Sequence, residues 1–290
     1  MTRVGGRAAN GGASDPGGGA AALVGPPLRD ALEAAVTALT AAGCSTPRLD
    51  AEVLIADALG ADRAVLHTEP DRAVTGAQAR LIGERVRRRV AREPVAYILG
   101  RRGFRRIEVL VDSRVLIPRP ETELLVEVAL ELPSGSRVHD VGTGSGAVAL
   151  ALLDERPDLA VSASDASPAA AEVARANAAR LGLPLEVSVG RALPAGDFDL
   201  VIANLPYVRE DEWDGLAPEI RRYEPREALV SGPDGLDAIR ELCAAAPPGT
   251  RLALEHAPGQ AAEVRALLSD AHTRSDLAGR ERVTVGTAPA

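Results

Sequence analysis

The sequence predicts an α/β protein in which a parallel sheet, with helices on both faces, follows a small helical domain. Three observations carry this prediction. Apolar side chains recur at helical spacing between residues 28 and 92, strand-like and helix-like segments alternate from Arg137 onward, and a glycine-rich loop lies between the first of these strands and its helix. Such alternation is typical of parallel sheets, because each strand needs a crossover to return the chain to the starting edge.

The composition bounds the class of protein. The 290 residues are enough for one large domain and one small domain. A net charge of -8 gives no electrostatic reason to expect a nucleic-acid partner, because duplex-binding proteins usually carry a basic surface. Cys44 and Cys243 lie far apart and the four histidines are scattered, so we expect no disulfide, no metal site and a cytoplasmic location. No apolar run approaches the roughly 20 residues of a membrane span.

The amino-terminal third is expected to contain a tail and the helical domain. Residues 1–27 are rich in glycine, alanine, serine and proline, which predicts a disordered tail and not a signal peptide. Residues 28–93 are expected to form the helical domain, whose first helix starts at Leu28 and stops at Gly43. The other helical segments are expected at about 47–59, 63–67 and 75–92.

Apolar spacing assigns a core face to each of these helices. The side chains expected to point inward are Leu28, Ala31, Leu32, Ala35, Leu39, Leu49, Val53, Leu54, Ala58, Leu81, Val86 and Val90. The segment Glu84–Arg92 is the basic cluster of the chain. Its arginines at 85, 88, 89 and 92 would share one face of a helix, which we expect to be solvated.

Residues 94–119 are expected to connect the two domains. Residues 97–100, Phe104 and 107–111 indicate an extended segment or a hairpin. The prolines that flank Arg119 then stiffen the backbone before a helix predicted over 120–132, which has acidic residues beside the positive end of its dipole. This segment is either a simple helix cap or a rigid lip that places Arg119 or Thr122 beside a ligand.

The second domain, expected over residues 120–290, contains the sheet. A final strand after the turn at 276–279 suggests a closing hairpin at the edge of this sheet. The strands are expected at about 137–141, 159–165, 185–190, 198–203, 250–256 and 281–286, and the helices between them at about 145–155, 167–181, 235–246 and 258–269.

A glycine-rich loop after the first strand indicates a ligand site. Gly142, Gly144 and Gly146 let the backbone turn sharply and approach a ligand at the start of a helix. Their spacing differs from the phosphate-binding loop and from the dinucleotide fingerprint. About twenty residues later Asp165 ends a strand, where a carboxylate can accept both ribose hydroxyls, and Asp140 is placed to meet a cation. A nucleoside that carries an amino acid suits this pattern, and S-adenosylmethionine is such a molecule.

Residues 204–207, Asn-Leu-Pro-Tyr, follow the apolar run 198–203, so we expect them at the carboxyl end of a buried strand, where ligands bind in open parallel sheets. The Asn204 side chain and the carbonyl of Leu205 offer two adjacent acceptors, which suit the NH2 of a primary amide or an exocyclic amine. Tyr207 would cover one face of that group. The alternative is a strand-to-loop turn with a capping asparagine.

These segments together resemble the HemK/PrmC family of glutamine methyltransferases. The resemblance covers about residues 48–285. It is carried by Pro94–Gly100, Ile117–Glu123 (IPRPETE), Asp140–Gly146 (DVGTGSG), Asn204–Tyr207, Arg222–Pro225 and Gly232–Leu236. The resemblance implies a Rossmann-like, S-adenosylmethionine-dependent methyltransferase domain with a seven-stranded, mostly parallel sheet, after a helical domain that recognises the substrate.

The family methylates the glutamine of the Gly-Gly-Gln motif in class-1 peptide chain release factors, so the resemblance implies these proteins as partners. It also implies the roles of particular residues. Those expected to bind the cofactor are Gly142, Thr143, Gly144, Ser145, Gly146, Asp165 and Asn204, and those expected to hold the reacting amide are Asn204, Leu205, Pro206 and Tyr207.

The chain departs from the family pattern at two places. Leu205 stands where the family has a proline, which keeps the carbonyl and loses one fixed dihedral. Residues 189–191 lack the acidic residue found near adenine.

Three other functions fit parts of the pattern. They are methylation of adenine N6 in nucleic acid, methylation of a ribosomal-protein glutamine, and cofactor binding without catalysis. The acidic net charge and the few aromatic residues argue against the first of these.

Overall fold

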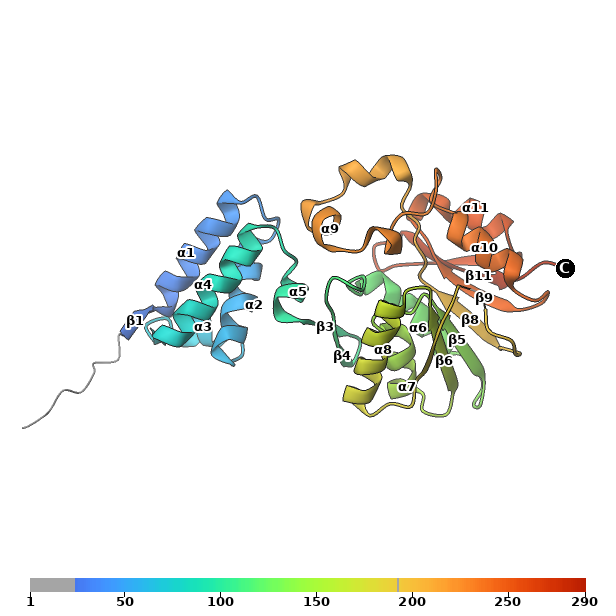
Figure 1. Cartoon of the computed structure of the whole chain (residues 1–290), viewed down its shortest axis with the longest axis horizontal. Helices are drawn as coiled ribbons and strands as arrows, with labels where there is room; N and C mark the ends of the chain where they lie inside the picture. The colour runs from blue at the N-terminus through green and yellow to red at the C-terminus, as the bar shows by residue number, and fades with distance from the viewer. Residues whose placement is uncertain (1–23, 192) are drawn as a thin grey trace, which may run out of the picture.

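The computed structural model describes residues 24–191 and 193–290. Figure 1 shows a helical part at the amino-terminal side and an α/β part that contains the large sheet, with the segment around α9 (Pro218–Tyr223) lying between them. The prediction of an α/β protein preceded by helices is confirmed.

The helical part packs three longer helices around one core. These are α1 (Leu28–Ala41), α2 (Pro47–Leu59) and α4 (Gly76–Val90), joined by the short α3 (Val65–Thr68). A capping box between Thr75 and Gln78 fixes the start of α4, and Gly60 ends α2 in the left-handed conformation. The predicted helices are therefore present, to within two residues at most ends.

Several predictions for this part are wrong in detail. Strand β1 (Val24–Pro27), which pairs with β2 (Ala73–Thr75), lies within the predicted tail; residues 1–23 lie outside the described residues. Leu49, Leu81 and Val90 are exposed, whereas Ala51, Ile55 and Ile82 fill the core. The reason is that apolar residues occur on several sides of α2 and α4, so their spacing alone does not select one face.

The arginine face of α4 is not solvated. Arg89 is only 5% exposed and donates to Asp50 of α2 (2.7 Å) and to Glu219 of α9 (2.9 Å). Arg92 makes two further hydrogen bonds to Glu219, at 2.9 and 2.7 Å. The prediction failed because the acidic partner is 130 residues away in the chain. This face is the contact between the helical part and the α/β part.

The connection between the two parts begins with helix α5 (Val95–Leu99), and the predicted hairpin follows it as β3 (Arg101–Phe104) and β4 (Ile107–Leu110). Residues 97–99 are therefore helical and not extended. Tyr97 is buried and donates to the carbonyl of Val115 at 2.5 Å, which anchors α5 to the chain beyond the hairpin.

The α/β part is built on a seven-stranded sheet, as the resemblance implied. Its order is β10-β11-β9-β8-β5-β6-β7, and only β11 pairs antiparallel, with β9 and β10. The strands are β5 (Arg137–Val141), β6 (Ala160–Asp165), β7 (Glu186–Val189), β8 (Leu200–Ala203), β9 (Arg251–Glu255), β10 (Ser269–Ser275) and β11 (Glu281–Thr287). Strand β10 was not predicted, because its sequence SDAHTRS lies half exposed at the edge and lacks apolar alternation.

Helices cover both faces of this sheet. Side chains at alternate positions of β8 divide between two cores: Leu200 and Ile202 face one, and Val201 and Ala203 face the other. The first core receives α6 (Glu123–Leu130), α7 (Ala147–Glu155) and α8 (Pro168–Leu181), and the second receives α10 (Asp237–Ala245) and α11 (Ala261–Ala266). The predicted helix over 258–269 is thus a 3-10 turn (Pro258–Gln260) followed by the shorter α11.

The strand order reverses at β5, which has β6 on one side and β8 on the other. Helices α7 and α8, which connect β5 to β6 and β6 to β7, pack on one face of the sheet, and α10, which lies between β8 and β9 in the chain, packs on the other face. In doubly wound sheets this arrangement opens a crevice at the carboxyl ends of the strands. The glycine loop, Asp165 and Asn204 all follow the ends of these three strands.

We predict that the contact between the two parts weakens in acid through Glu219. Burial raises the pKa of this carboxyl, but hydrogen bonds from Arg92, from the backbone and from Arg89 outweigh burial and lower the pKa from 4.5 to about 2. These bonds therefore stabilise the folded state fully above about pH 4.5, and this stability is lost as the pH falls toward about 2. Glu219→Gln should flatten the dependence of unfolding free energy on pH between about pH 2 and 4.5, measured by denaturant titration.

Glu263→Gln is the matched control, because Glu263 is an exposed glutamate of α11. Its curve should run parallel to that of the wild-type chain. A Glu219→Gln curve that is also parallel would contradict the prediction.

Candidate active site

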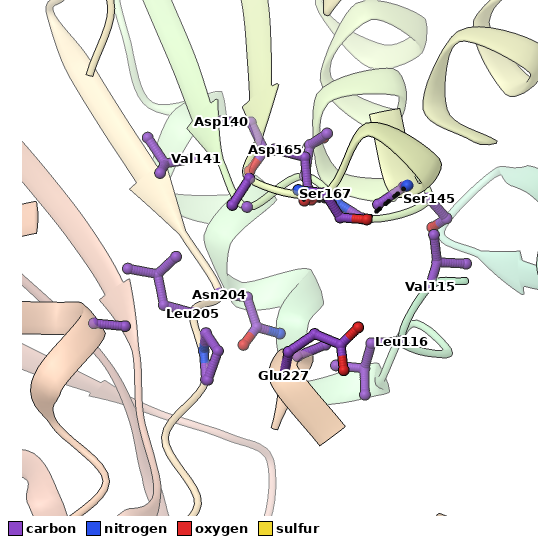
Figure 2. Close-up of a pocket in the computed structure, with 18 of the residues that line it drawn as sticks. Val115, Leu116, Asp140, Val141, Ser145, Asp165, Ser167, Asn204, Leu205 and Glu227 are labelled. Atoms are coloured by element: carbon purple, nitrogen blue, oxygen red, sulfur yellow. Dashed lines mark hydrogen bonds between the residues drawn. The ribbon is translucent and has the colours of Figure 1, made fainter. Parts of the chain in front are cut away.

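A cavity of about 350 Å³ lies at the carboxyl ends of β5, β6 and β8. Its volume is in the range of small-molecule and cofactor sites. Figure 2 shows Asp140 and Asp165 on one side of this cavity and Asn204 and Leu205 on another. Segments that are far apart in the sequence thus meet at the crevice that the strand order creates.

The glycine loop forms one wall of the cavity. Gly142, Gly144 and Gly146 have φ of +73°, +56° and +81°, which favour glycine over any residue with a Cβ. A Cβ on Gly142 would also lie 3.0 Å from Cδ2 of Leu205, so the loop and residue 205 are in close contact. Gly146 does not line the cavity. It caps α7, where a Cβ would meet Leu150 and Ala174, so its role is in packing.

Asp165 is held rigidly at the rim of the cavity. Its Oδ2 accepts from the backbone N–H of Gly144 and its Oδ1 from that of Ser167, both at 2.8 Å. Two fixed donors leave further lone pairs of both oxygens for a ligand. Residues 190–191, where the family's acidic residue is absent, line the same cavity.

Asp140 lies deeper, with only 2% of its surface exposed. Burial raises the pKa of this carboxyl to about 7, although hydrogen bonds from Thr143 Oγ1 (2.6 Å) and from the backbone of Ala149 oppose that shift. A cation in the cavity would favour the ionised form. The sequence-based expectation that Asp140 meets a cationic group is compatible with this placement.

Asn204 extends from the end of β8, all four residues of which are buried. Its Nδ2 donates to Oγ1 of Thr122 at 2.9 Å, and none of the described side chains or backbone amides donates to its Oδ1. Asn204 and Thr122 both line the cavity. The amide oxygen is therefore the part of Asn204 that is available to a ligand.

The three residues after Asn204 take different positions. Leu205 and Pro206 line the cavity, and the Leu205 side chain packs against the core formed by α10, α11 and the sheet. Tyr207 does not line the cavity. Its Oη donates to Oε1 of Glu255 at 3.3 Å, and its carbonyl accepts from Gln260 Nε2 at 3.0 Å.

The IPRPETE segment supports this wall, and only part of it reaches the cavity. Arg119 does not line the cavity; it donates to Oε1 of the buried Glu224 at 2.5 Å. The other oxygen of Glu224 accepts from the backbone N–H of Ile117 at 3.2 Å. Arg119 and Thr122 were the two residues expected beside a ligand. Thr122 lies at the cavity, whereas Arg119 lies outside it and stabilises the segment through its bond to Glu224.

Sequence reasoning missed several residues around this cavity. Val115, Leu116, Glu227 and Glu241 line it, and Figure 2 shows Glu227 and Leu116 opposite the strand ends. Glu255 was also missed as the partner of Tyr207. None of them belongs to a local motif with a chemical meaning. An isolated glutamate in a turn, helix or strand is normally interpreted as a solvated side chain, so the sequence held no signal for Glu227, Glu241 and Glu255.

The described residues contain neither a metal-binding cluster nor a membrane-spanning helix. No cluster of three or more histidine, cysteine, aspartate or glutamate side chains is arranged to hold a metal ion within residues 24–191 and 193–290. In the same part of the chain, no helix has the length and apolar character needed to span a membrane.

Comparison with known proteins agrees with this architecture. Residues 30–100 match the family model described as the PrmC N-terminal domain, and residues 120–220 match the one described as the methyltransferase small domain. A solved methyltransferase structure from Pyrococcus furiosus has 15% identity, covers 63% of this chain and 89% of its own, and gives a TM-score of 0.44, too distant to bear on function.

Curated relatives match over nearly their whole length, and each of the following three carries the name release factor glutamine methyltransferase. The protein from Xylella fastidiosa strain Temecula1 is 44% identical over 88% of this chain and 98% of its own. Those from Rhodospirillum rubrum (39% identical, 94% of this chain and 89% of its own) and Mycolicibacterium smegmatis (40%, 90% and 97%) are similar.

We predict that Asp165→Ala weakens the binding of S-adenosylmethionine by at least about tenfold. The substitution removes a charged acceptor, and loss of such a hydrogen bond typically changes binding by about 1.5 to 3 kcal/mol. Isothermal titration calorimetry measures the dissociation constant. Asp62→Ala, at an exposed aspartate of the helical part that does not line the cavity, should bind as the wild-type chain does. Equal affinity in both variants would refute the role of Asp165.

Proposed function

This chain belongs to the family of release factor glutamine methyltransferases, and from that premise we propose that it transfers a methyl group from S-adenosylmethionine to the side-chain amide nitrogen of a release-factor glutamine. The observation that carries the proposal is the presentation of Asn204. None of the described residues donates to its amide oxygen, and Asn204 lines the same cavity as the glycine loop that follows β5.

The residues that line the cavity have the chemical groups needed to bind S-adenosylmethionine. Gly142 and Gly144 line the cavity without side chains, so a ligand can approach their backbone closely, which suits the amino acid part of the cofactor. Asp165 offers fixed carboxylate oxygens to ribose hydroxyls, and the buried Asp140 favours a cationic ligand. S-adenosylmethionine supplies, when bound, an electrophilic methyl group on a positively charged sulfur.

The protein must bind and orient a weak nucleophile. The nitrogen of a primary amide is weakly nucleophilic because its lone pair is delocalised into the carbonyl. Asn204 Oδ1 and the Leu205 carbonyl can accept its two N–H hydrogens, which fixes the nitrogen and stabilises the positive charge that develops on it. Alignment alone can lower a barrier by about 7 to 11 kcal/mol in favourable intramolecular reactions. The nitrogen gives its extra proton to water once it carries the methyl group, so the roles of Asn204, Leu205 and Pro206 are in positioning and electrostatic stabilisation.

Tyr207 has a less direct role in this proposal. Its hydroxyl is bonded to Glu255, and burial raises the pKa of that hydroxyl. Tyr207 is thus neutral and anchored, and it stabilises the wall that carries Asn204 and Leu205 instead of serving as a base.

The substrate is proposed as a class-1 release factor, modified at the glutamine of its Gly-Gly-Gln motif. The relatives' shared name supports the substrate class, and the match of residues 30–100 to the PrmC N-terminal domain supports a recognition role for the helical part. Action on the translation apparatus implies the cytoplasm. Adenine in RNA or DNA is the less favoured substrate, since the net charge is -8 and the relatives are named for a protein substrate.

Asn204→Ala is expected to lower the methylation rate by on the order of a thousandfold, because the variant can no longer orient the amide. The dissociation constant for S-adenosylmethionine should change by less than about threefold, since the glycine loop and Asp165 are untouched. Single-turnover methylation and calorimetry measure the two quantities. Full activity in this variant would exclude the proposed role of Asn204.

A labelling panel tests the substrate. The full chain is incubated with radiolabelled S-adenosylmethionine and, separately, with a class-1 release factor, a ribosomal-protein mixture and ribosomal RNA. We expect label only on the release factor, and mass spectrometry should place it on the Gly-Gly-Gln glutamine. A release factor with asparagine in place of that glutamine is the matched control and should take no label. Label on RNA, or on no component, would overturn the proposed function.

A further inference from the structure

Asn177 is a buried residue of α8 that no step of the proposed reaction uses. It is 0% exposed and does not line the cavity. Its Oδ1 accepts from the backbone N–H of Leu110 at 2.7 Å, and its Nδ2 donates to the carbonyl of Leu110 at 3.0 Å and to the carbonyl of Ser145 at 2.9 Å. One N–H and two carbonyls around the side chain allow a single orientation of its amide, with the oxygen toward the N–H. The three bonds therefore form one fixed cross-link.

The stability of α8 itself does not explain an asparagine at this position. Its buried neighbours Ala174 and Ala178 are small and apolar, and asparagine is a poorer helix former than alanine. With Leu110 the Asn177 amide pairs as a neighbouring strand would, since it accepts from the N–H and donates to the carbonyl of the same residue. With Ser145 it reaches the glycine loop, 32 positions earlier in the chain. Asn177 therefore joins the β3–β4 hairpin to the glycine loop from outside the cavity.

The glycine loop needs such a cross-link because glycines do not fix their own backbone. Gly144 and Gly146 flank Ser145 and have no Cβ that would hinder rotation of the peptide groups between them. The N–H of Gly146 donates to the carbonyl of Thr143 at 2.8 Å, and Asn177 supplies the donor for the Ser145 carbonyl. The peptide group between Ser145 and Gly146 is thus held at both ends. Without Asn177, the carbonyl of the buried Ser145 would lose its partner or the peptide group would rotate toward another donor.

We propose that Asn177 is a positioning residue, which acts through the Ser145 carbonyl to hold the glycine loop in the form that receives the amino acid part of S-adenosylmethionine. This inference rests on the proposed function and deepens it, because it assigns a role to a residue outside the cavity. The bonds to Leu110 have a second effect. Leu110 ends β4, and the chain beyond it reaches the cavity at Val115 and Leu116, so Asn177 joins two parts of the cavity wall (Figure 2).

Two ligands that differ in the amino acid part separate this role from general stabilisation. S-adenosylhomocysteine contains that part, and 5′-methylthioadenosine has the nucleoside and the sulfur without it. Asn177→Asp keeps the shape and the acceptor for the Leu110 N–H but removes the NH2 that bonds Ser145, and Asn177→Leu removes all three bonds. Each should raise the Kd for S-adenosylhomocysteine by at least about tenfold, as the loss of a buried hydrogen bond can, and the Kd for 5′-methylthioadenosine by less than about threefold. NMR titration measures both constants, because it detects weak binding as well as tight binding.

Val173→Ala is the matched control, because Val173 is 3% exposed on the same helix, packs in the first core and does not line the cavity. It should lower the midpoint of thermal unfolding, as the loss of buried methyl groups does, and leave the ratio of the two Kd values unchanged. A variant that is partly unfolded loses apparent affinity for both ligands by the same factor, so this ratio does not depend on stability. An unchanged ratio in the Asn177 variants would overturn the proposal.

A measurement on the wild-type chain tests the proposal even if the Asn177 variants do not fold. In ¹⁵N-labelled protein, the two side-chain N–H signals of Asn177 report its bonds to Ser145 and Leu110. S-adenosylhomocysteine should shift these signals, because a ligand bonded to the loop backbone polarises the hydrogen bonds that continue from it, and 5′-methylthioadenosine should leave them in place. Asn177 signals that stay in place with S-adenosylhomocysteine bound would overturn the role of Asn177. Absence of label on a release factor, with these signals and the Kd ratios as expected, would overturn only the proposed substrate.

Discussion

The site depends on a single directional constraint, which is that the NH2 group of Asn204 is already occupied by Thr122. An amide side chain has a donor end and an acceptor end of nearly equal shape, so its environment must decide which one faces a ligand. Here the IPRPETE segment supplies Thr122, whose hydroxyl accepts from Nδ2 of Asn204. Its backbone is stiffened by Pro118 and Pro120, and Glu224 fixes it by accepting from both Arg119 and the backbone of Ile117. The segment thus provides a fixed acceptor for Asn204.

The segment between Asn204 and Glu224 connects the cavity with the helical part. The chain that leaves the Asn-Leu-Pro-Tyr segment continues through α9 to Glu224, so one stretch of polypeptide carries both the wall of the site and its main contact with the helices. Glu219 at one end of α9 is bonded to Arg89 and Arg92, and Tyr223 at the other end donates to the carbonyl of Ala91 at 2.9 Å. A substrate bound between the two parts would therefore contact a wall whose position both parts determine.

How much of this the sequence could predict depends on the range of each interaction. The glycine loop and Asn204 were found because each is a local motif whose chemistry follows from a few neighbouring residues. The helices were found because their spacing is local too, although Leu49 and Leu81 show that spacing fails where several faces are apolar. Strand β10 was missed because an edge strand with one polar face and few apolar residues leaves no periodic signal.

Contacts between distant segments could not be predicted. Arg89 looks like any solvated arginine of a basic helix until Glu219 is brought beside it, and Glu255 looks like the last residue of an apolar strand. A single sequence does not indicate which residues 82 or 130 positions apart, such as Thr122 and Asn204 or Arg89 and Glu219, come into contact in the fold. The motifs therefore predicted which groups carry chemistry, whereas the packing shows which groups hold them in place.

The leucine at position 205 shows why these two kinds of information must be combined. As a motif residue it is a departure, because a proline ring would fix the backbone dihedral that aims the carbonyl. In the structure its side chain packs against the core and approaches Gly142 so closely that a Cβ there would lie 3.0 Å away. Buried side-chain contacts thus restrict the backbone where a ring would have done so. The carbonyl that we propose as the second acceptor is common to leucine and proline, so the substitution keeps the group that this proposal needs.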